Sequence, residues 1–166
     1  VYDNFLSSLA TLGISTYVAG PEMDATSDLL DDLVDKYANV TVVGHSSGSL
    51  NAILASSNNP SVKTVVLMDP VDNSDLFSFL GKEKKKLTMR YVEKVLFLNA
   101  AKSYEWGLSP MDLSIPFIPG FRITPDKLVL KKGFSETIEA TNFGHSDILD
   151  DEWSDIMHKS LSKGSD

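Results

Sequence analysis

Residues 40–48 read Val-Thr-Val-Val-Gly-His-Ser-Ser-Gly, and the fold can be predicted outward from them. Val40–Val43 has the length and the β-branched content of a buried strand. Leu50, Ile53 and Leu54 follow at helical spacing and predict a helix. The pattern G-x-S-x-G between the two elements is typical of a sharp strand-to-helix turn that carries a serine at its tip.

Strain at this turn explains why the residues around the serine are small. A serine on such a turn takes unusual backbone angles. We therefore expect the flanking positions to need glycine or a very small residue, as at Gly44 and Gly48, because a larger side chain would clash with the helix and the neighbouring strand. The turn raises the hydroxyl of Ser46 above the carboxyl ends of the strands, where open α/β sheets bind ligands. The amide of Ser47, at the helix start, is then a candidate oxyanion donor. The alternative is a glycine-rich turn without chemistry, but the flanking strand and helix favour a nucleophile.

The other predicted elements alternate along the chain. Continuous apolar runs predict buried strands, and apolar residues three and four apart predict helices. We expect strands over Ile14–Ala19, Lys63–Met68, Val92–Leu98 and Thr137–Thr141, and helices over Val1–Leu12, Thr26–Tyr37 (capped by Thr26 or Ser27), Asn73–Leu80 and Ile148–Leu161. This order predicts a single α/β domain over residues 1–166, with a mainly parallel sheet covered by helices on both faces.

Composition excludes several classes of function. The net charge is −8 and no basic cluster exceeds Lys82–Lys86, so nucleic acid is not an expected partner. The longest apolar runs are too short to cross a bilayer, so no transmembrane segment is expected. The chain has no cysteine, which removes disulfides, thiolate catalysis and zinc–cysteine sites.

A serine nucleophile on such a turn takes its acid, and then its histidine, from later in the chain. His145 follows the last predicted strand, in a loop entered through Gly144. His45 adjoins the serine and is better explained as a flanking residue, whereas His158 lies in the predicted closing helix. His145 is therefore the expected general base.

The acid has two candidates. Its usual position is the turn after Val92–Leu98, but that turn reads Asn-Ala-Ala-Lys-Ser and contains no carboxylate. Asp69 follows the preceding strand, 69 − 46 = 23 residues after the serine, and Pro70 would stiffen its turn. An acid there could fix the tautomer of the histidine and stabilise the imidazolium. Asp72 is the second candidate, and its alternative role is a turn or helix-capping residue.

Residues 101–127 form a long irregular stretch in which prolines and glycines interrupt large apolar side chains. A loop this long and this apolar is usually a lid or a binding loop, and the alternative is a packed surface excursion. The side chains that we expect to contact a substrate there are Trp106, Met111, Phe117 and Phe121.

Three segments together resemble the chlorophyllases of plants and algae. That family carries Gly-His-Ser-x-Gly, an Asp-Pro-Val turn with the triad acid, and Gly-His-x-Asp-x-Leu-Asp-Asp around the triad histidine. Here the segments read Gly44-His-Ser-Ser-Gly48, Asp69-Pro-Val-Asp72 and Gly144-His-Ser-Asp-Ile-Leu-Asp-Asp151. The resemblance implies an α/β-hydrolase fold with Ser46, Asp69 and His145 as the catalytic triad. Plasma-type platelet-activating-factor acetylhydrolases place their acid after the same strand, so the acid position alone does not select chlorophyllase.

The resemblance implies hydrolysis of a carboxylic ester of a large hydrophobic substrate, either chlorophyll, giving chlorophyllide and phytol, or a lipid ester. The implied reaction needs no cofactor or metal. It further implies a chloroplast location and peripheral association with a thylakoid membrane or a pigment–protein complex. A protein of a different class is the alternative: a catalytically idle hydrolase-fold chain that binds a pigment or lipid, or serves as a structural subunit of a membrane complex.

The chain opens inside a predicted helix, so we expect it to begin part-way through a longer protein. The N-terminal strands of the hydrolase fold would then be absent from it. So would the loop after the third strand, which supplies the second oxyanion donor.

Overall fold

The computed structural model describes residues 2–20, 22–71, 86–100 and 122–142. These residues fall into two compact units. The sheet unit comprises residues 19–20, 22–71, 86–99 and 122–140, and the second unit comprises residues 2–18, 100 and 141–142. The second unit contains α1 (Asp3–Thr11), which is followed by Gly13 at φ 75°. The predicted first helix and its glycine end are therefore confirmed.

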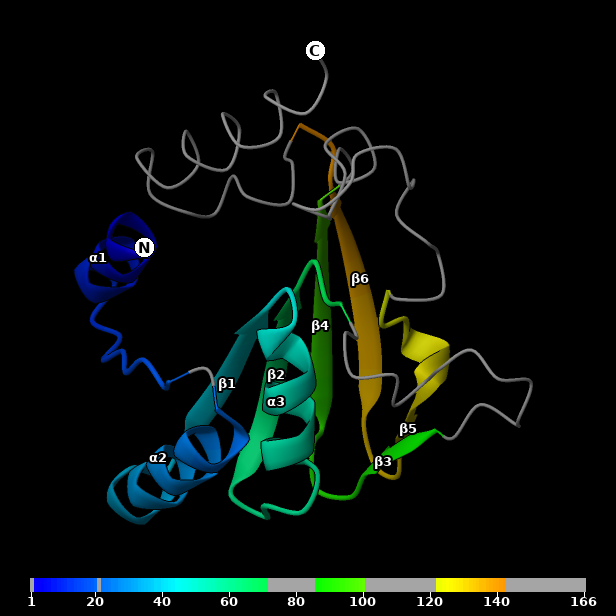
Figure 1. The fold of residues 1–166 in the computed structure, drawn as a ribbon, viewed down its shortest axis with the longest axis horizontal. Coiled ribbons are helices and arrows are strands. Elements are labelled where there is room, and N and C mark those ends of the chain that lie inside the picture. The colour runs from blue at the N-terminus through cyan, green and yellow to red at the C-terminus, as the bar shows by residue number, and fades with distance from the viewer. Residues whose placement is uncertain (1, 21, 72–85, 101–121, 143–166) are drawn as a thin grey trace. The chain divides into compact units, whose positions relative to one another are not determined.

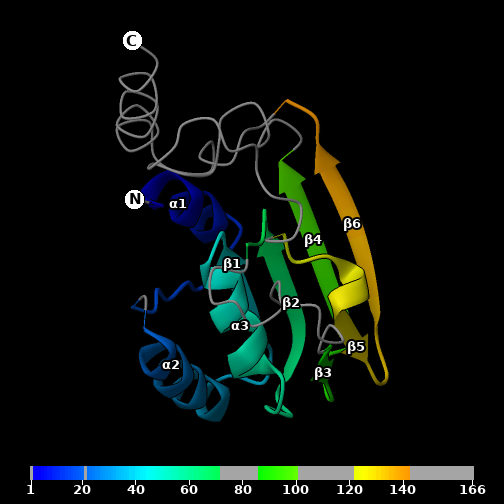
Figure 2. The ribbon, with the colours of Figure 1, turned by 45° about the vertical axis from the view of Figure 1, so that its right-hand side comes forward.

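A four-stranded sheet forms the centre of the sheet unit. Its strands in spatial order are β1 (Val40–His45), β2 (Val62–Met68), β4 (Lys94–Ala100) and β6 (Phe134–Ala140) (Figure 1). β2 pairs in parallel with β1 on one side and with β4 on the other. Two side-chain contacts join β4 to β6: Lys94 to Glu136 at 2.9 Å and Asn99 to Glu139 at 2.8 Å. The residue later in β4 contacts the residue later in β6. These two strands therefore also run in the same direction, as their arrowheads in Figure 2 show.

Two helices cover one face of this sheet. α3 (Gly48–Ser56) packs on β1 and β2 through Leu50 and Ile53, which are 4 % and 0 % exposed. α2 (Met23–Lys36) packs against α3 and buries Leu30 (Figures 1 and 2). The helices predicted at 73–80 and 148–161 lie outside the described residues. The parallel α/β architecture is confirmed, and the expectation of helices on both faces stays a prediction.

The core explains why the predicted strands are continuous apolar runs. Val65, Leu67, Val95 and Phe97 are fully buried on the two central strands. Each such side chain contributes roughly 1.5–3 kcal/mol of hydrophobic stabilisation when it leaves water. The central strands therefore hold the sheet together, and they place their carboxyl ends at fixed positions along its edge.

Two sequence expectations are corrected. Segment 14–19 is not a strand, because Ile14, Tyr17 and Val18 are about half exposed or more and lack the packing that β-propensity reflects. α2 begins at Met23 with Glu22 as its N-cap, so neither Thr26 nor Ser27 caps it. The backbone N–H and the side-chain hydroxyl of Thr26 both donate to the Glu22 carbonyl, as expected inside a helix.

A second, small sheet was not predicted. β3 (Leu87–Met89) and β5 (Leu128–Leu130) pair in parallel, and the short helix η1 (Pro125–Lys127) leads into β5. Three-residue strands are too short to produce a detectable periodicity in sequence. No helix among the described residues is long and apolar enough to span a membrane.

Candidate active site

The strand register brings three polar residues to the carboxyl edge of the sheet. The last paired residues of β1 and β2 are His45 and Met68, and Met68 is also paired with Leu98 of β4. The next residues along the three strands are Ser46, Asp69 and Asn99, which we call the carboxyl edge. Neighbouring strands are roughly 5 Å apart, so Ser46 and Asp69 follow adjacent strands at the same level. The sequence predicted that Ser46 and Asp69 each follow the carboxyl end of a strand, and the structure shows that these two strands are neighbours.

Ser46 is held in a strained backbone conformation. Its φ is 54°, a value that non-glycine residues rarely adopt. Three backbone hydrogen bonds hold Ser46 in this conformation. Its N–H donates to the carbonyl of Met68 at 3.0 Å, and its carbonyl accepts from the N–H groups of Ser49 and Val71, each at 3.1 Å. Strain of this kind persists only where the surrounding structure over-determines it, and it is concentrated at functional sites. The predicted sharp turn is therefore present at Ser46.

The two glycines of the motif differ in their surroundings. A Cβ on Gly44 would lie 2.5 Å from the Cα of Ser49 and 2.9 Å from the Cβ of Ala52 and the carbonyl of Gly48. A Cβ on Gly48 would meet nothing within 4 Å. The expectation that steric clashes require both glycines is therefore wrong for Gly48. Only Gly44 lies where the helix crosses close over the strand.

We expect Gly44→Ala to lower the free energy of unfolding by about 3 kcal/mol or more, because the methyl group overlaps backbone atoms that cannot move independently. Gly48→Ala is the matched control, and its stability should lie within about 1 kcal/mol of the parent. Urea unfolding followed by circular dichroism measures both changes. Equal destabilisation by the two substitutions would contradict the close approach at Gly44.

The start of α3 presents backbone donors beside Ser46. Ser47 is the N-cap residue of α3 and is exposed, and its side chain makes no capping hydrogen bond. The first N–H groups of a helix lack acceptors within the helix, and the helix dipole makes this end favourable for negative charge. The local structure therefore suits the predicted role of the Ser47 amide as an oxyanion donor.

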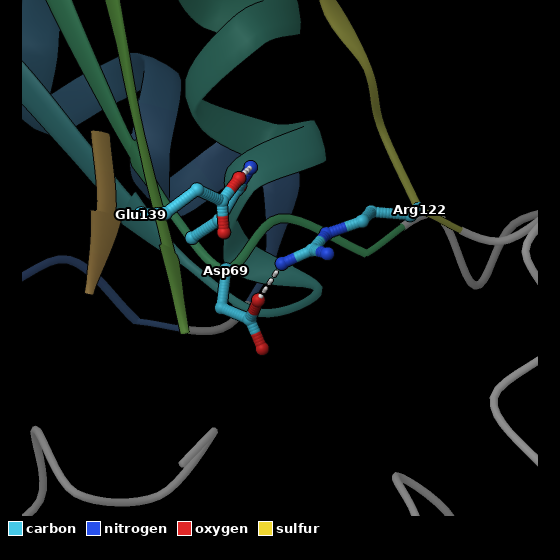
Figure 3. A network of polar contacts seen from close by, with 4 residues as sticks. Asp69, Arg122 and Glu139 are labelled. Carbon is cyan, nitrogen blue, oxygen red and sulfur yellow. Dashed lines mark hydrogen bonds and ion pairs between the residues drawn. The ribbon is translucent and has the colours of Figure 1, made fainter. Parts of the chain in front are cut away.

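Asp69 is buried and strained at the end of β2. Its φ is 42° and it is 4 % exposed. Its N–H donates to the carbonyl of Leu98 at 2.7 Å, which ties the turn to β4. Its Oδ1 lies 2.5 Å from Nη2 of Arg122, and Figure 3 shows the other carboxylate oxygen pointing away from the guanidinium. Among the described non-glycine residues, only Ser46 and Asp69 have positive φ.

Sequence reasoning missed Arg122. It lies at the end of the predicted loop 101–127, of which residues 101–121 lie outside the described part of the chain. The one feature of the sequence that could have indicated Arg122 is its position between two apolar residues, Phe121 and Ile123. Nothing local to that stretch indicates that its partner is an aspartate 53 residues earlier.

Asn99 occupies the position where the acid of such a site usually follows its strand. Its Nδ2 donates to Oε1 of Glu139 on β6 at 2.8 Å. Its Oδ1 is buried and accepts no hydrogen bond from the described residues. Asn99 therefore connects the carboxyl edge to β6. Across the residues that the structure describes, no group of three or more His, Asp or Glu side chains is placed to hold a metal ion.

Several predicted site residues lie outside the described residues. These are the general base His145, the second acid candidate Asp72, and the substrate-contacting residues Trp106, Met111, Phe117 and Phe121. Their roles stay predictions. No protein-family model and no curated protein matches this sequence.

Proposed function

We propose that this chain carries the nucleophile, base and acid of a serine ester hydrolase with an α/β-hydrolase fold. Ser46 is the nucleophile, His145 the general base and Asp69 the acid. The observation that supports the proposal most is the strained φ of 54° at Ser46, between a parallel strand and a helix that crosses Gly44 in close contact. A glycine would occupy this position without strain, so a serine there is better explained by chemistry than by folding.

The proposed mechanism is two-step acyl transfer. The Oγ of Ser46 attacks the ester carbonyl while His145 takes its proton, and the Ser47 amide donates to the oxyanion. Collapse of the tetrahedral intermediate releases the alcohol, which receives the proton from His145, and leaves an acyl-serine. Water then attacks the acyl group with His145 again as base. The bond from the acyl carbon to Oγ breaks, Ser46 takes the proton back from His145, and the carboxylic acid leaves. Asp69 orients His145 and stabilises its charged form throughout.

We propose a large hydrophobic ester as the substrate, either chlorophyll or a lipid. The support is the similarity of the three motifs to those of chlorophyllases and the density of large apolar side chains in residues 101–127. A chlorophyllase-like reaction would cleave the ester between the porphyrin propionate and phytol. The chloroplast location and the association with thylakoid membranes follow from the same similarity.

Labelling with a fluorophosphonate tests the function directly, because this probe reacts with a serine only when a base activates it. We expect stoichiometric labelling of the native chain, with the adduct found on the tryptic peptide that contains Ser46. Ser135 lies exposed on β6 and is the internal control, which should stay unmodified. Labelling that is absent, or no faster in native than in heat-denatured protein, would favour the catalytically idle alternative.

A further inference from the structure

Arg122 is the charged partner of the proposed acid. Its Nη2 lies 2.5 Å from Oδ1 of Asp69, and the two side chains are only 11 % and 6 % exposed. A charge pair so far from water interacts strongly, but removing both groups from water is costly. Such a pair is stable only where its geometry is well defined by the surrounding structure.

The backbone on both sides of Arg122 is anchored. Arg122 forms an isolated antiparallel bridge with Val71, and the N–H of Ile123 donates to the carbonyl of Pro70 at 3.1 Å. Ile123 is 1 % exposed, and the buried Lys127 donates from Nζ to the carbonyl of Arg122. The guanidinium therefore extends from a fixed point of the chain, directly beside the turn that follows β2.

The guanidinium of Arg122 contacts the side chain of Asp69, and the backbone of Asp69 is itself held in place. The turn at Asp69 is tied to β4 through Leu98 and to the nucleophile turn through the hydrogen bond from Val71 to Ser46. The contact with Arg122 restricts rotation of the Asp69 side chain through Oδ1. In Figure 3 the second oxygen then points away from the guanidinium.

We propose that Arg122 is a positioning residue: its contact with Oδ1 fixes the orientation of the Asp69 carboxylate, the group that orients the general base in the proposed mechanism. The inference rests on the proposed function and deepens it. Two further charged side chains of the described residues have other partners: Nζ of Lys127 donates to the carbonyl of Arg122, and Glu139 accepts from Asn99.

The test is a double-mutant cycle between Arg122 and Asp69, with kcat/KM for p-nitrophenyl butyrate as the readout. We expect Arg122→Gln to lower kcat/KM by about 10- to 100-fold in the parent, the range typical of residues that orient a reacting group. In an Asp69→Asn background the same substitution should change kcat/KM less than about twofold, because no carboxylate is left to orient. Arg122→Lys should recover most of the loss, since it restores a cation at the same place.

Lys63→Gln is the matched control, because it removes an exposed cation, 3.6 Å from Glu93, from the same sheet. It should leave kcat/KM unchanged. An equal loss from Arg122→Gln in both backgrounds, or an Arg122→Lys variant no better than Arg122→Gln, would overturn the positioning role. Circular dichroism confirms that each variant is folded at the assay temperature. Failure of the proposed function looks different: the parent would then show no turnover that depends on Ser46, which would remove both proposals.

Discussion

Replacing Ser46 by alanine is expected to lower ester turnover by about 100,000-fold or more. Loss of the nucleophile leaves only binding and oxyanion stabilisation, and changes of this size are found when a catalytic serine is removed from a triad. The measurement is kcat with p-nitrophenyl butyrate and p-nitrophenyl palmitate, a short and a long ester. Ser135→Ala, an exposed change on β6, should keep full activity. Turnover by Ser46→Ala within tenfold of the parent would exclude Ser46 as the nucleophile.

The strained backbone of Ser46 supplies a second variant at the same position. Glycine accepts a φ of 54° without the steric cost that a side chain incurs, so Ser46→Gly should be as inactive as Ser46→Ala. It should also raise the free energy of unfolding by about 1 kcal/mol relative to Ser46→Ala. Urea unfolding measures the difference. A glycine variant that is less stable than the alanine variant would show that the turn carries no strain at this residue.

Replacing Asp69 by asparagine is expected to lower kcat by about 1,000- to 10,000-fold. An amide cannot stabilise the imidazolium, and it favours the wrong tautomer of the histidine. The change should also destabilise the fold by about 3 kcal/mol, because the guanidinium of Arg122, 11 % exposed, would lose its charged partner. Kinetics are therefore measured at a temperature where unfolding curves show the variant to be folded.

A further substitution distinguishes the two candidate acids, Asp69 and Asp72, and a second one is its control. Asp72→Asn should keep kcat within a few-fold of the parent. Asp31→Asn, which removes a carboxylate from the exposed side of α2, should have no effect and controls for the change in net charge. If Asp72→Asn loses most of its kcat and Asp69→Asn does not, the acid is Asp72, and the buried pair of Asp69 with Arg122 is structural.

The sequence predicted those features that depend on neighbours along the chain. The apolar runs at Val40–Val43 and Lys63–Met68 identified β1 and β2, and the alternation of strands with helices predicted a mainly parallel sheet. Glycine, serine and proline at the strand ends then placed Ser46 and Asp69 on the turns that follow these strands. These predictions succeeded because buried strands and tight turns leave strong local patterns. Segment 14–19 has a similar local pattern and is not a strand, because its side chains remain exposed to water.

The tertiary structure alone decided what the two turns contact. The partnership of Asp69 with Arg122 joins residues 53 positions apart, and it depends on an isolated bridge at Val71 that no periodicity signals. Gly44 and Gly48 look equivalent in the motif, yet only Gly44 lies under the crossing helix. A sequence pattern records the conformation that a segment prefers, whereas a steric clash or a buried charge pair depends on which distant atoms the folded chain brings to the same place.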